Sequence, residues 1–104
     1  MIRRFDVVRN PRADLRPAVP YLVVLQSHFL PDFPTLVVAP LRLASASEGL
    51  PGLQTPVTFD DDAYAVMITE LAHLPRKPLG AAVGNLEAFE FEIARALDRL
   101  FTGF

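Results

Sequence analysis

Short apolar stretches separated by turn residues make up most of the chain, and this pattern predicts β-strands. In residues 2–8, Phe5 and Val7 fall on one face while charged residues fall on the other, as in a half-buried strand. Residues 21–27 read Tyr-Leu-Val-Val-Leu-Gln-Ser and are apolar on both faces. We therefore expect residues 21–27 to form a central strand that is covered on both sides.

Residues 35–39 predict the next strand. We expect this strand to end at Pro40, because proline has no N–H group for the hydrogen-bond ladder. The following residues 43–56 are rich in small residues, glycine and proline, which indicates a loop.

A β-hairpin is predicted around Asp60-Asp61-Asp62, because aspartate tolerates the backbone angles of tight turns. Residues 57–59 form its first strand, and residues 63–69 return with apolar residues at every second position. Residues 71–78 are bounded by proline and predict a further loop.

The last part of the chain changes to a helical period over residues 86–101. Asn85 is the expected N-cap. One helix face is apolar and is expected to be buried; its members are Leu86, Phe89, Ile93, Leu97, Leu100 and Phe101. Phe91 breaks the pattern, because it lies on the polar stripe of Arg95, Asp98 and Thr102. Residues 1–104 are thus expected to form one domain, mostly β with one C-terminal helix, as a small antiparallel barrel-like sheet.

Hydrophobic residues make up 51% of the chain, a high share for a domain whose interior is this small. We expect a partner to cover part of this surplus, most simply a second copy of the chain. The net charge of −2 lacks the basic footprint of a protein that grips nucleic acid directly. Without cysteine, signal peptide or membrane-spanning stretch in the sequence, a soluble cytoplasmic protein is expected.

Candidate catalytic chemistry is sparse. The aspartates at 60–62 lack the full pattern of a calcium loop, and His28 and His73 show no metal-binding or triad spacing. The loop that carries His73, Arg76 and Lys77 holds groups that bind phosphate and move protons. Solvated turns and ordinary surface histidines remain the simpler interpretation of these residues.

The chain ends on Phe101-Thr102-Gly103-Phe104, an unusually apolar terminus. Burying a Phe side chain contributes about 1.5–3 kcal/mol. Burying the unpaired terminal carboxylate beside it would cost more. The ending therefore predicts a tip held at the surface, where another molecule can contact it.

Three segments resemble the CcdB family, the toxin half of plasmid and chromosomal addiction modules that poison DNA gyrase. These are residues 23–27 (Val-Val-Leu-Gln-Ser), residues 36–41 (Leu-Val-Val-Ala-Pro-Leu), and residues 79–104, which align without gaps. The resemblance implies an SH3-like barrel of the plasmid-maintenance toxin fold, with a C-terminal helix and assembly as a homodimer.

The resemblance also implies a function. The family's dimer binds the A subunit of DNA gyrase through its C-terminal tips, and the disordered C-terminal segment of a cognate antitoxin removes it. This implies no catalysis, no cofactor, no direct nucleic-acid binding and no membrane partner. The gyrase-binding residues carried over are Thr102, Gly103, Phe104, Asp98 and Glu90, with Phe91 as a further interface anchor.

One position departs from the family pattern: its tip reads Trp-Gly-Ile, whereas Thr102 replaces the tryptophan here. Losing a tryptophan from the centre of an interface can cost over about 2 kcal/mol. Two alternatives therefore stay open. One is a messenger-RNA-cleaving ribonuclease toxin of the same fold, using His73, Arg76, Lys77 and Asp60. The other is a non-toxic CcdB-like interaction module that no longer binds gyrase.

Overall fold

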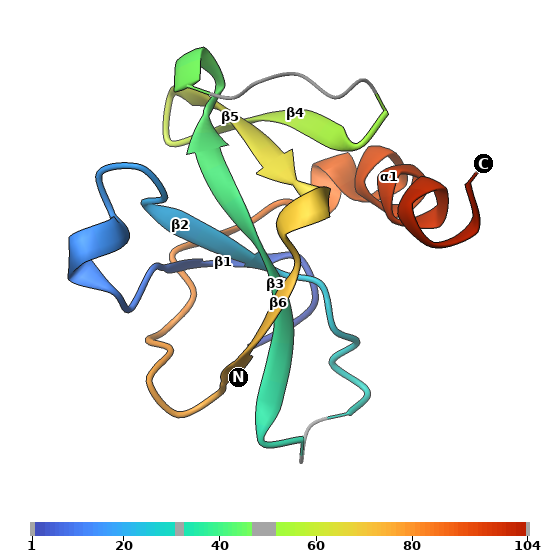
Figure 1. Cartoon of the computed structure of the whole chain (residues 1–104). Helices are drawn as coiled ribbons and strands as arrows, with labels where there is room; N and C mark the ends of the chain where they lie inside the picture. The colour runs from blue at the N-terminus through green and yellow to red at the C-terminus, as the bar shows by residue number, and fades with distance from the viewer. Residues whose placement is uncertain (1, 31–32, 47–51, 104) are drawn as a thin grey trace.

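The computed structural model describes residues 2–30, 33–46 and 52–103. These residues form an antiparallel sheet with one α-helix after it (Figure 1). The strands are β1 (Asp6–Arg9), β2 (Tyr21–Val24), β3 (Thr35–Leu43), β4 (Gln54–Phe59), β5 (Asp62–Met67), β6 (Ala72–Pro75) and β7 (Gly84–Asn85), and the helix is α1 (Glu90–Thr102). The expected mostly-β architecture with a C-terminal helix is confirmed.

The sheet runs in the order β4-β5-β3-β2-β1-β7 and curls into a half-barrel around the long strand β3. One edge of β3 pairs with β2. The other edge pairs first with β6, over residues 35–38, and then with β5, over residues 41–43. β3 therefore stands in the middle of the sheet and pairs with other strands along both of its edges.

The sheet is covered on both faces. On the inner face, Val23 of β2 packs in a core with Leu41, Val66 and the α1 residue Ile93. On the other face, Leu22 and Val24 pack in a second, smaller core beneath the loops. The prediction that β2 is a central strand buried on both sides is therefore confirmed.

Two strand boundaries differ from the expected ones for backbone reasons. β1 begins only at Asp6, because Phe5 has a positive φ of 70° and turns the chain into the strand. Phe5 is still buried in the inner core, as expected. β3 continues through Pro40 to Leu43. Residues 39–40 lie between the part of β3 that pairs with β6 and the part that pairs with β5. The N–H that Pro40 lacks is therefore not needed for either of these two pairings.

The sequence does not indicate β6, because its four residues are short of a strand signal and end on a proline; all but Leu74 are exposed. Its backbone pairing with β3 supplies the order that its side chains do not indicate. The hairpin prediction is confirmed: Phe59 pairs with Asp62 across a two-residue loop. Asp60 and Asp61 both have positive φ, 51° and 67°, as a type I′ turn requires.

The helix begins later than predicted, at Glu90, after a 3₁₀ turn at Glu87–Phe89. Asn85 is therefore not the N-cap of α1; it lies two residues before the 3₁₀ turn, where its side-chain oxygen accepts the Glu87 amide at 2.7 Å. The N-cap residues are Leu86 for the 3₁₀ turn and Phe89 for α1, and neither makes a side-chain cap. No helix in the described ranges is long and apolar enough to cross a membrane.

Candidate partner-binding helix and neighbouring cavities

The outer stripe of α1 is solvent-exposed, as the sequence predicted. It consists of Phe91, Arg95, Asp98 and Thr102. The Phe91 ring is 68% exposed, and the Arg95 guanidinium carbon lies 5.7 Å from its centroid. This cation–π contact restrains the Phe91 ring and leaves most of its surface exposed to another molecule.

The last turn of α1 carries more exposed apolar surface than the helical pattern predicted. Leu100 is 37% exposed and Phe101 is 73% exposed, although both were expected on the buried face. The side chains that α1 buries are Ile93 and Ala96, which come from its middle. The sheet ends beneath them, and Figure 1 shows the end of α1 extending past the strands. The terminal apolar residues therefore have little of their own domain to pack against.

The tip has a defined backbone. Gly103 adopts φ 81°, and its amide donates to the Arg99 carbonyl at 2.9 Å, which is a left-handed helix cap. The Thr102 hydroxyl donates to the Asp98 carbonyl at 2.6 Å, so its proton is already used within the helix. Phe104, the third predicted tip residue, lies outside the described residues.

The predicted gyrase-binding residues do not all lie together. Asp98, Thr102 and Gly103 share the final turns of α1, whereas Glu90 begins the helix. Twelve helical steps between Glu90 and Thr102 correspond to about 18 Å. Glu90 instead lines a cavity of about 200 Å³ that also contacts Arg3, His28 and Phe29.

A groove of about 390 Å³ separates α1 from β4. Phe91, Arg95 and Arg99 line its helix side, and Gln54 and Pro56 line its strand side. The groove borders the outer stripe, so one partner segment can contact both surfaces.

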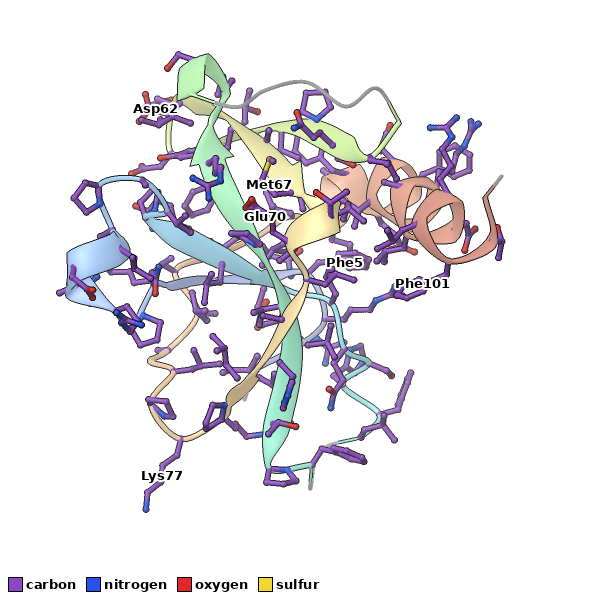
Figure 2. The ribbon with its side chains drawn as sticks, in the orientation of Figure 1. Phe5, Asp62, Met67, Glu70, Lys77 and Phe101 are labelled. Carbon is purple, nitrogen blue, oxygen red and sulfur yellow. The ribbon has the colours of Figure 1, made fainter. Side chains whose placement is uncertain are left out.

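Of the residues considered for RNA cleavage, Asp60 is not brought together with the segment that carries His73, Arg76 and Lys77. Asp60 sits in the β4–β5 hairpin, whereas His73 lies on β6, paired with Val37 at the other half of β3. Figure 2 shows the same separation, with Asp62 of the hairpin and Lys77 at opposite ends of the molecule. Across the described ranges, no three His, Asp or Glu side chains gather closely enough to hold a metal ion.

His28 has basic residues around it in the folded protein. His28 Nδ1 lies 3.4 Å from the Arg4 amide, and its Nε2 lies 3.2 Å from the Arg3 guanidinium. Arg76 lines a small second cavity with His28, and its Nε donates to the Phe33 carbonyl at 3.0 Å. The sequence does not indicate this cluster, because its members come from three distant segments without a shared local pattern.

Solved structures with the same fold define the class of protein. The Mycobacterium tuberculosis toxin MazF-mt6 matches with a TM-score of 0.71 and 20% identity, covering 95% of this chain and 96% of that one. A mycobacterial endoribonuclease solved with its cognate antitoxin matches at 0.72 and 18%, covering 97% and 95%. A further mycobacterial endoribonuclease matches at 0.69 and 20%, covering 96% and 90%. This is the fold of toxins from toxin–antitoxin systems.

The family model described as CcdB protein matches residues 4–103, nearly the whole chain. The chain belongs to the CcdB family, and family and fold together place it among the toxins of toxin–antitoxin systems. A search of curated proteins finds no match.

The expectation that this protein is not an enzyme is contradicted by the structural neighbours, two of which are described as endoribonucleases. That expectation came from the resemblance to gyrase-poisoning toxins and agreed with the lack of metal or triad motifs. RNA cleavage needs only a few proton-transferring and phosphate-binding groups, so missing motifs do not exclude it. The expectation that the protein does not bind nucleic acid directly is likewise not supported, because these neighbours are described as endoribonucleases.

Proposed function

We propose that this protein is a toxin that binds the A subunit of DNA gyrase through the last turn of α1 and poisons the enzyme. The observation that carries the proposal is the exposed apolar end of the helix, directly before the positions that correspond to the gyrase-binding tip of the family. Phe101 leaves 73% of its surface exposed beside Thr102 and Gly103.

Phe101 takes over part of the role of the missing tryptophan. Thr102 contributes little binding area, and its hydroxyl is committed to its own helix. Phe101 is the neighbouring large ring, and burying most of it in an interface contributes about 1.5–2 kcal/mol. Binding to gyrase is therefore retained, but it is weaker than with a tryptophan at position 102.

A pull-down with purified gyrase A subunit tests this proposal. Wild type is retained, Phe101→Ala is retained at least about tenfold less, and Thr102→Trp is retained more strongly. Leu15→Ala is the matched control, because Leu15 is also an exposed apolar residue but lies in the β1–β2 loop. If wild type and Thr102→Trp both fail to bind, the protein is a CcdB-like interaction module without this target.

We further propose a homodimer in the cytoplasm, where gyrase acts. Its support is a second apolar surface in the β2–β3 loop, where Phe29 is 82% exposed, Phe33 53% and Leu30 47%. Large contiguous apolar patches on a protein surface often mark interaction sites. Light scattering after gel filtration should give a dimer for wild type and a monomer for Phe29→Ser. A wild-type monomer at micromolar concentration contradicts the homodimer.

We propose that the cognate antitoxin places its disordered C-terminal segment in the groove between α1 and β4. The groove adjoins the outer stripe of α1. A segment bound in the groove therefore blocks the access of gyrase to the helix. Arg95 and Arg99 favour an acidic segment there. Phe91→Ala should weaken antitoxin binding in a co-purification assay while leaving the fold unchanged, because the ring is mostly exposed.

RNA cleavage is the second candidate function, and the cluster around His28 favours it. An imidazole can accept the proton of a ribose 2′-hydroxyl as its oxygen attacks phosphorus. The 5′-oxygen leaves and takes a proton from water, which gives a 2′,3′-cyclic phosphate and a 5′-hydroxyl. The Arg3 guanidinium, 3.2 Å from the ring, can stabilise the phosphate charge. Incubation with messenger RNA tests this: cleavage should be lost in His28→Ala and kept in His73→Ala. Intact RNA with wild type rejects the candidate.

A further inference from the structure

Another cavity, of about 390 Å³, lies where β1 ends, and none of its lining residues lines the cavities described above. Arg9 and Arg16 form its basic side, Tyr21 and Phe59 form its aromatic side, and Asp60 stands at its rim. Its volume falls within the range of small-molecule sites. β1 separates it from His28, because Arg9 is the last residue of the strand and the His28 cluster adjoins its start.

The two arginines are available to a ligand. Neither Arg9 nor Arg16 forms an ion pair with a carboxylate in the described part of the chain. Arg16 is held in place by its Nε, which donates to the Asn10 carbonyl at 2.7 Å. Asn10 is itself buried, with its side chain bonded to the Val19 carbonyl and the Arg12 amide. The fold thus positions the Arg16 guanidinium and leaves its terminal NH₂ groups free to bind an anion.

The aromatic side is rigid. The Tyr21 and Phe59 rings meet edge to face with centroids 5.1 Å apart, and Tyr21 makes a second such contact with Tyr64. Gly84 lies against the Phe59 ring so closely that a Cβ would collide with it. A pre-organised ring surface of this kind suits stacking with a flat ligand.

We propose that this cavity binds a nucleoside 5′-monophosphate, with the phosphate on Arg9 and Arg16 and the base against Tyr21. Paired guanidinium groups bind phosphate through charge-assisted hydrogen bonds. Asp60 accepts the adjacent N–H groups of a guanine base, and its negative charge disfavours an acidic peptide in the same cavity. The proposal is independent of gyrase binding and of RNA cleavage.

Two-dimensional NMR titration of the full chain with guanosine 5′-monophosphate tests this site. Saturable shifts are expected at Arg9, Tyr21 and Asp60. The separate probes are inorganic phosphate and guanosine, each of which should bind at least about tenfold more weakly than the nucleotide. Arg9→Ala should weaken nucleotide binding about tenfold or more, because a charge-assisted contact is lost. Arg12→Ala is the matched control, since Arg12 is exposed and already paired with Asp14 at 2.7 Å.

Several results would overturn the proposal. These are no saturable shift at millimolar nucleotide, equal weakening by Arg9→Ala and Arg12→Ala, and inorganic phosphate binding as tightly as the nucleotide. Binding of a poly-glutamate peptide at the same residues, without nucleotide binding, would assign the cavity to an acidic protein segment instead. Tyr21→Leu provides a second check, because it should lower nucleotide affinity and leave phosphate affinity unchanged.

Discussion

The stability of the C-terminal helix should depend on its middle and hardly at all on its last turn. Ile93 is fully buried, and Ile93→Ala removes three carbons from the inner core. At about 0.8 kcal/mol for each carbon group, plus the cavity left behind, unfolding free energy should fall by about 3–4 kcal/mol. Phe101 is 73% exposed, so Phe101→Ala should cost less than about 1 kcal/mol although it removes a larger group.

Urea unfolding followed by circular dichroism, at one protein concentration for all variants, measures both losses. A domain of this size has about 5–15 kcal/mol of stability, so the expected difference is large enough to resolve. Similar losses for Ile93→Ala and Phe101→Ala would refute the reasoning. Such a result would mean that Phe101 is packed within the toxin itself and is not free for a partner.

Three further outcomes are expected. Gly84→Ala should destabilise the protein by about 1–3 kcal/mol in urea unfolding, because its Cβ would collide with the Phe59 ring; an unchanged stability would contradict that contact. Asp61→Val should cost about 1–2 kcal/mol in thermal unfolding, since φ there is 67°, whereas Asp61→Gly should be tolerated. Burial, with the nearby charge of Asp62, raises the pKa of Tyr64 above 10.0. The stability that the protonated Tyr64 hydroxyl contributes is therefore complete below pH 10 and is lost as the pH rises further. In urea unfolding at alkaline pH, Tyr64→Phe should abolish this loss.

The parts of the fold that depend on side-chain pattern could be predicted from the sequence. The apolar segment around Val23 indicated a central strand, and Asp60-Asp61 indicated the hairpin. The parts that depend on backbone register could not. Continuation of β3 past Pro40 and the order in residues 72–75 both follow from how β5 and β6 share one edge of β3.

The candidate site divides in the same way. The helical period correctly identified the outer stripe with Phe91, but it could not show that the sheet ends before Leu100 and Phe101. The surroundings of His28 escaped prediction because Arg3 and Arg76 reach it only through tertiary structure. Patterns along one helix were visible in the sequence, whereas contacts between distant segments were not.

Calorimetry of purified gyrase A subunit with intact toxin and with toxin lacking residues 101–104 tests directly whether the end of α1 binds gyrase. The truncated protein should keep its fold, because Phe101 is mostly exposed and neither Thr102 nor Gly103 belongs to either described core. Intact toxin should bind, and truncation should abolish binding. Equal binding by both proteins, or none by the intact toxin, would contradict it.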